Sequence, residues 1–319
     1  MDRRELMKYL AASSVAGAAL TSRSLDAAQV VGPQVTTHSA DKLPPLSVPA
    51  EGKMPVAFVI GKDAEVLDFC GPLEVFAQAW TKDGNSLFAP YMVSGTMEPV
   101  KVGGGMRVLP DYTYKDAPAP KIIVIPAMNM EGLPPDMFDW IREASIKTDI
   151  TMSVCNGAFV LAKTGLLAGK RCTAHHGGYF RFAGMFPDVK LVRGARFVED
   201  GKFASAGGVS SGIDLALRVV ERYLGTEAAA NLADGIEYQG KGWKNSDSND
   251  AYATLPELNE STPLCPLCLM DGDRSIKTIY KGKNFYFCSQ GEKEFFDRHL
   301  DVYDKFVAED TMRAVKPKN

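Results

Sequence analysis

The sequence has no excess of basic residues, and this lack limits the partners that it can have. Its 319 residues include 36 Lys and Arg against 39 Asp and Glu, a formal net charge of −3. Nucleic-acid-binding domains normally carry a clustered positive excess, so we expect no nucleic-acid partner. Beyond the first thirty residues the chain also lacks any run close to the ~20 apolar residues that span a bilayer. We therefore expect no transmembrane helix and no membrane anchor.

The first thirty residues resemble a bacterial twin-arginine export signal. Arg3 and Arg4 precede a mildly apolar run at 10–20, and no charge lies between Lys8 and Arg23. That lack of charge argues against the alternative, an ordinary amphipathic helix. The paired arginines predict the twin-arginine export machinery as a partner. Because the segment has no cysteine for lipid attachment, we expect a periplasmic product without a lipid anchor. Residues 31–53, which contain four prolines, then have the composition of a linker.

Between residues 54 and 240, strand and helix patterns alternate. The predicted strands are 56–60, 88–93, 121–126, 150–154 and 171–174, with helices at 71–80, 135–147 and 210–224 and a hairpin turn at 199–201. Alternation of this length predicts an α/β fold, a doubly wound parallel sheet with helices on both faces. In such sheets, ligands bind outside the carboxyl ends of the strands.

Cys155 stands where the predicted strand 150–154 breaks into a helix, followed by Asn156 and Gly157. A residue in such a sharp turn is held above the carboxyl edge of the sheet, as in a nucleophile elbow. The amino end of the following helix would favour thiolate over thiol, which suits a cysteine nucleophile. The alternative is a packed cysteine, because free cysteine is among the most buried residue types.

Several spaced motifs in residues 54–240 resemble the ThiJ/PfpI superfamily, and within it the isonitrile hydratase branch. They are residues 68–76 (DFCGPLEVF), 153–157 (SVCNG), 165–167 (GLL), 173–175 (TAH), 200–201 (DG), 206–208 (AGG) and 212–214 (GID). The resemblance implies a flavodoxin-like α/β sandwich and a homodimer. It also implies a cysteine-dependent hydratase or lyase that acts on a small electrophile, an isonitrile or an aldehyde, with no cofactor in this domain.

The resemblance places Asp68 where the family keeps an acidic partner for the cysteine, although Asp68 could instead cap a helix. It implies that Asn156 contributes a backbone N–H to an oxyanion hole. His175, at the end of the strand 171–174, is a further candidate, because a neighbouring strand end would bring it close to the sulfur. Ala127 and Met128 replace the usual glycine pair of the family, which narrows the expected site.

Past a polar linker at 241–261, the chain contains Pro266, Cys268 and Met270 and, later, the run 286–289 (YFCS). On these two motifs, residues 262–306 resemble a YHS domain, a small metal-associated α+β module. Cys265, Cys268 and Cys288 have spacing typical of a zinc site, and Glu292, one helical turn after Cys288, could complete the ligand shell. His299 would lie too far along the helix to join. Soft thiolates also suit Cu(I), and a disulfide is the alternative in an oxidising compartment. A non-catalytic metal-binding or redox-sensing protein is therefore the second possible function.

Replacing both Arg3 and Arg4 with Lys should retain the precursor in the cytoplasm, because the paired arginines are the part of the signal that export would require. Cell fractionation followed by immunoblotting measures this directly. Periplasmic accumulation at the unmodified level would contradict the export prediction.

Overall fold

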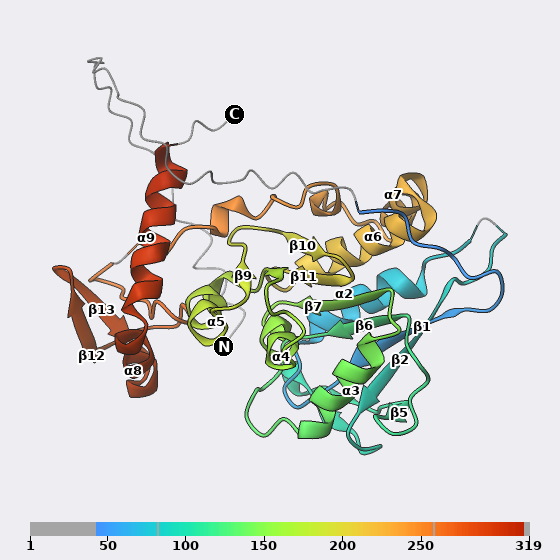
Figure 1. Cartoon of the computed structure of the whole chain (residues 1–319), viewed down its shortest axis with the longest axis horizontal. Helices are drawn as coiled ribbons and strands as arrows, with labels where there is room; N and C mark the ends of the chain where they lie inside the picture. Colours follow the sequence, from blue (N-terminus) through green and yellow to red (C-terminus); the bar gives the residue numbers. More distant parts are fainter. Residues whose placement is uncertain (1–42, 82, 258, 316–319) are drawn as a thin grey trace, which may run out of the picture. The chain divides into compact units, whose positions relative to one another are not determined.

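Figure 1 shows the computed structural model of the chain, which describes residues 43–81, 83–257 and 259–315. The predicted export signal at 1–30 and the first part of the predicted linker, residues 31–42, lie outside these ranges. Within them, no helix combines the length and the apolar character that crossing a membrane requires.

A seven-stranded sheet forms the centre of the α/β domain, in the order β10-β11-β7-β6-β1-β2-β5. Neighbouring strands are parallel except for the antiparallel pair β10 and β11. The strands are β1 (Met54–Val59), β2 (Phe88–Ser94), β5 (Tyr112–Thr113), β6 (Ile122–Ile125), β7 (Ile150–Val154), β10 (Phe197–Asp200) and β11 (Phe203–Ala206). The central strands β6 and β7 are buried along their whole length, as expected where helices cover both faces of a parallel sheet.

Helices lie on both faces of this sheet, which confirms the predicted doubly wound fold (Figure 1). On one face α2 (Val66–Ala77) packs against α6 (Ser211–Leu224), with α7 (Thr226–Gly235) beside it. On the other face α3 (Pro135–Ser145) packs against α4 (Gly157–Lys163). Short elements complete the domain: β3 (Val100–Lys101), β4 (Arg107–Val108), β8 (Arg171–Cys172), β9 (Lys190–Leu191), α5 (Tyr179–Met185) and the 3-10 turns η1 (Gly103–Gly105) and η2 (His176–Gly178).

Two sequence predictions near the site are wrong in register or pairing. Helix α2 begins at Val66 rather than at residue 71, so Asp68 lies inside its first turn and Glu65, not Asp68, is the N-cap. The predicted strand 171–174 is reduced to β8, which pairs with β9 in a separate small sheet. Strand β11, not β8, is therefore the neighbour of the elbow strand β7.

The segment 241–261, predicted as a linker, packs partly against the α/β domain. It contains the 3-10 turns η3 (Gly242–Lys244) and η4 (Asp250–Tyr252). The backbone N–H of Trp243 donates to Asp214 Oδ1 at 2.8 Å, and the Trp243 side chain is buried. This part of the segment is a packed connection and not a free tether.

The C-terminal module contains the predicted hairpin and helix, namely β12 (Asp273–Tyr280), β13 (Lys283–Phe287) and α8 (Gln290–Arg298). Helix α9 (Leu300–Val315) continues past residue 306, where the module was predicted to end. Phe285, Phe287 and Phe296 form its small aromatic core. The buried Arg193 of the α/β domain pairs with Glu309 and Asp310 of α9, at 2.9 and 2.7 Å.

Candidate active site and metal centre

Cys155 lies in the turn between β7 and α4, with the left-handed backbone conformation (φ 58°) that a nucleophile elbow requires. Its N–H donates to the carbonyl oxygens of Ala206 and Gly207, at 3.1 and 3.0 Å. Two positions later, a Cβ atom at Gly157 would lie only 2.1 Å from the Ile125 carbonyl oxygen. Only glycine allows α4 to start this close to the end of β6, so the local sequence fixes the elbow.

Asp68 is fully buried in the first turn of α2, and one hydrogen bond orients its carboxyl group. Its Oδ2 accepts from the Ala127 N–H at 2.9 Å. Its Oδ1 is buried without a regular hydrogen bond, and the Cys155 thiol lies close enough to perturb the pKa of the carboxyl. The structure thus brings Asp68 and Cys155 together, as the sequence predicted.

Burial changes the protonation of both groups. It raises the pKa of Asp68 from 3.8 to about 7, the Ala127 N–H opposes that rise, and the charge of Glu65 adds to it. Burial, followed by the negative charge of Asp68, also raises the pKa of Cys155 well above its ordinary value. The predicted thiolate is therefore wrong for the resting site. A helix terminus contributes about 0.3–1 kcal/mol, less than one pKa unit, whereas burial shifts a pKa by up to about 3–5 units.

A protonated thiol beside a carboxyl group with a pKa near 7 is a proton-transfer pair. Ionised Asp68 can accept the thiol proton as sulfur attacks an electrophile, and the acid so formed can return it to the product. A carboxyl pKa near the working pH makes both transfers accessible. Activation of the sulfur therefore depends on Asp68 more than on the end of α4.

The backbone N–H of Asn156, predicted for an oxyanion hole, faces the sulfur and lowers the pKa of Cys155, although burial raises that pKa by more. Its side-chain Oδ1 is buried without a hydrogen-bond partner and lies against Gly178. The Ala127 N–H, which occupies the place of the family's glycine pair, is already used by Asp68. Donors for a developing anion must therefore come from the Asn156 side of the elbow.

His175 does not serve as a base for Cys155 in the described structure. Its Nδ1 accepts from the Gly177 N–H at 3.0 Å and caps η2, and no hydrogen bond joins its ring to the sulfur among the described residues. Burial and the neighbouring His176 lower its pKa to about 4, so the ring is neutral. The prediction assumed that its strand lay beside β7, but β11 takes that position.

Glu65 is a residue of this site that sequence reasoning missed. It is exposed at the N-cap of α2, and its charge raises the pKa of both Asp68 and Cys155. The signal was present, since Glu65 precedes Asp68 by three residues and residues at that spacing share a helix face. It was hidden because the helix was predicted to begin five residues too late.

Cys265, Cys268 and Cys288 form a second chemical centre, the cysteine triad. Their sulfur atoms lie within 4.8 Å of one another, and Cys268 and Cys288 are 3.4 Å apart. A hydrogen bond from Cys268 lowers the pKa of Cys265 to about 6, despite burial. Tetrahedral zinc with Zn–S bonds of about 2.3 Å needs sulfur atoms about 3.8 Å apart, so small shifts would fit the triad to an ion.

Glu292 does not join this group of three, although it was predicted as the fourth ligand. Its Oε1 pairs with Arg181 of α5, while its Oε2 is buried with no hydrogen-bond partner. Burial raises the pKa of Cys288, and the charge of Glu292 adds a smaller rise. His299 bonds the Phe295 carbonyl instead, so it stays outside the triad as expected.

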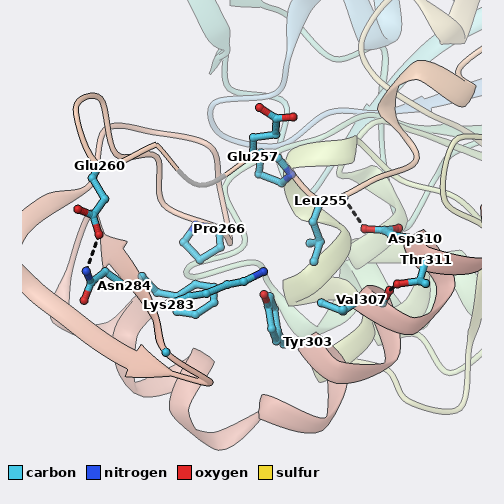
Figure 2. A pocket seen from close by; sticks show the side chains of 13 residues that line it. Leu255, Glu257, Glu260, Pro266, Lys283, Asn284, Tyr303, Val307, Asp310 and Thr311 are labelled. Atoms are coloured by element: carbon cyan, nitrogen blue, oxygen red, sulfur yellow. Dashed lines mark hydrogen bonds between the residues drawn. The ribbon is translucent and has the colours of Figure 1, made fainter. Parts of the chain in front are cut away.

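The cavity in Figure 2, of about 630 Å³, is lined by residues of the segment 241–261 and of the C-terminal module. Leu255, Pro266, Lys283, Tyr303 and Val307 are among its lining residues. None of its lining residues belongs to the elbow or to the cysteine triad. We therefore take the elbow, which holds the perturbed proton-transfer pair, as the candidate active site.

Comparison with known proteins places the elbow within a family. The model of the DJ-1/PfpI family matches residues 54–222. Isonitrile hydratase of Pseudomonas putida is 28% identical over 189 residues, which cover 57% of this chain and 78% of that protein. The HTH-type transcriptional regulator GbdR of Pseudomonas aeruginosa is 22% identical over 196 residues, 60% of this chain but only 53% of the regulator.

Solved structures support the same fold. The crystal structure of a ThiJ/PfpI family protein from Pseudomonas syringae aligns with a TM-score of 0.53 and 22% identity. The alignment covers 66% of this chain and 82% of that chain. At this level of identity the likeness supports the architecture and not an activity.

The alkylation rate of Cys155 should rise through an inflection near pH 7, because ionised Asp68 accepts the thiol proton. In Asp68→Asn that inflection should vanish, leaving only the rise at higher pH that follows thiolate formation. Iodoacetamide labelling, quenched at a series of times and followed by mass spectrometry of the Cys155 peptide, measures both pH profiles. An inflection near pH 7 that survives in Asp68→Asn would show that another group controls the thiol.

Proposed function

Because the chain belongs to the DJ-1/PfpI family over residues 54–222, we propose that it is a cysteine-dependent hydratase or lyase acting on a small electrophile. The substrate class that we propose is an isonitrile or an aldehyde. One observation carries this proposal, namely the buried Asp68 carboxyl group, with a pKa of about 7, beside the Cys155 thiol. A merely packed cysteine would not need an acid at its sulfur, since burying a carboxyl group costs free energy.

For an isonitrile, the proposed reaction has two stages. The Cys155 sulfur bonds the terminal carbon, and the thiol proton passes through Asp68 to that same carbon, giving a thioimidate. Water then adds to the thioimidate carbon, and Asp68 carries one of the water protons to the nitrogen. The carbon–sulfur bond of this adduct breaks as its hydroxyl group becomes the carbonyl, and the hydroxyl proton passes through Asp68 to the leaving sulfur. The sum is isonitrile plus water giving an N-substituted formamide, with the thiol restored.

In this scheme each side chain of the elbow has one task. Cys155 is the nucleophile, and Asp68 carries the proton in both stages. The Asn156 N–H stabilises negative charge that develops next to the sulfur. We assign His175 the structural task of holding η2, because its Nδ1 is already occupied by Gly177.

The test is turnover by the purified, reduced protein against a panel of alkyl isonitriles and small aldehydes. Cys155→Ala should abolish turnover, and Asp68→Asn should lower kcat/KM by about 10²–10⁴-fold, the usual contribution of general acid–base catalysis. Cys70→Ala, which removes a half-buried cysteine from the same helix as Asp68, is the matched control and should stay within about twofold. Turnover that survives in Cys155→Ala, or no turnover with any substrate of the panel, would overturn the enzyme proposal.

The cysteine triad supports a second function, binding of one zinc or Cu(I) ion by the YHS-like module. Three sulfur atoms within 4.8 Å of one another fit the donor set, and the unpartnered Glu292 Oε2 would supply the fourth ligand after a shift toward the triad. When bound, the ion would cross-link the 265–268 loop to the start of α8. This cross-link would stabilise the folded module, whose aromatic core is small.

We further propose that the protein works in the periplasm as a homodimer, after export by the twin-arginine machinery. Its proposed partner is a small-molecule substrate. We propose neither a nucleic-acid partner nor a membrane anchor. The sequence features at 1–30 and the family resemblance support these proposals.

Metal analysis of the reduced protein should give about one equivalent of zinc or Cu(I) per chain, and Cys268→Ser should reduce it to near zero. Cys70→Ala is the control and should keep the full equivalent. Plasma emission spectroscopy after dialysis measures the content. A content near zero in the reduced, metal-supplied protein would favour the disulfide alternative for the triad.

A further inference from the structure

One short segment lies between the elbow and the cysteine triad. Residues 177 and 178 of η2 are both glycines, and each packs against one of the two centres. A Cβ atom at Gly178 would lie 2.6 Å from Asn156 Oδ1, whereas a Cβ atom at Gly177 would lie 3.5 Å from the Cys268 carbonyl oxygen. The backbone of η2 thus lies next to both the residue after Cys155 and a residue of the triad.

His175 links the same segment to Cys155 by a second route. Its Nδ1 accepts from the Gly177 N–H, and its ring lies 3.0 Å from the place of a Cβ atom at Gly208. The preceding carbonyl, that of Gly207, accepts from the Cys155 N–H at 3.0 Å. A displacement of Gly177 would therefore reach the elbow from both sides.

Helix α5, which follows η2 directly, is held by the helix that begins beside Cys288. Arg181 pairs with Glu292, one turn into α8, and lies over the Phe295 ring at 5.2 Å. Phe180 stacks on Phe296 with ring centroids 5.3 Å apart. In Figure 1, α5 accordingly lies between the C-terminal module and α4. The Arg181–Glu292 pair clamps the segment 175–181 to α8, and Gly177 of the same segment lies next to Cys268.

We infer that occupancy of the cysteine triad controls the reactivity of Cys155 through the segment 175–181, with Arg181 as a positioning residue. The inference rests on both functions proposed above. An ion would draw the three sulfur atoms into one ligand geometry and fix Cys268, whose carbonyl oxygen lies next to Gly177. Close-packed interiors pass such small shifts to their neighbours instead of absorbing them.

The burial of Cys155 determines whether an ion at the triad raises or lowers its alkylation rate. Cys155 is only 6% exposed, so a reagent reaches it when the surrounding segments move apart. Fixing Cys268 restricts the movement of η2, and an occupied triad should therefore slow alkylation of Cys155. Binding at one site typically changes the affinity of a coupled site by a factor of about five or more, and we expect a change of similar size in the alkylation rate.

The experiment follows the iodoacetamide labelling rate of the Cys155 peptide in the reduced full-length protein, with and without one equivalent of zinc. Zinc should slow labelling about fivefold or more in the unaltered protein. It should have no effect in Cys268→Ser, which loses a ligand, or in Arg181→Ala, which keeps the triad but loses the clamp. Arg142→Ala, which removes a half-buried arginine that pairs with Asp139 on α3, is the matched control and should behave like the unaltered protein.

Each other outcome has a distinct meaning. Stoichiometric zinc with an unchanged labelling rate would overturn the inference and leave both proposed functions standing. Slowing that persists in Cys268→Ser would mean that zinc binds at the elbow itself, which also overturns it. No zinc binding at all would overturn the inference together with the metal proposal, while turnover at Cys155 would remain a separate measurement.

Discussion

The hydrogen bond from the Ala127 N–H to Asp68 Oδ2 is the interaction on which the elbow depends. It joins the first turn of α2 to the chain just after β6 and leaves the other carboxyl oxygen to the Cys155 side. Burial alone would favour a permanently protonated carboxyl group, and this N–H opposes that effect. The balance keeps the pKa of Asp68 near 7, where a proton can be both accepted and returned.

Ion pairs between the α/β domain and the C-terminal helices join the two chemical centres. Arg181 reaches Glu292, and the buried Arg193 reaches Glu309 and Asp310. Removing one partner of a buried pair leaves an uncompensated charge, so such pairs resist separation more than exposed ones do. Helices α8 and α9 are thereby held against the α/β domain.

Much of the fold could be predicted, because local patterns determined it. The buried run at 150–154 gave the elbow strand with its observed bounds, and the family motif placed Asp68 beside Cys155. Pro72 misled the prediction of α2, since proline usually opens a helix but here lies inside one. The position of His175 and the Arg181–Glu292 pair depend on contacts between distant segments, which spacing along the chain cannot reveal. The thiolate prediction failed because burial, a property of the folded state, outweighs the helix terminus.

The central claim is that Asp68 and Cys155 share a proton-transfer equilibrium near neutral pH. Carbon-13 NMR titration of the Asp68 carboxyl group tests it most directly, with assignment by Asp68→Asn. The account predicts a pKa near 7, because burial is its main cause, and a small rise of that pKa in Cys155→Ala, because the hydrogen bond from the thiol lowers it. A carboxyl group that titrates near its ordinary value of 3.8 would contradict the account, because Asp68 would then be too weak a base to activate the thiol.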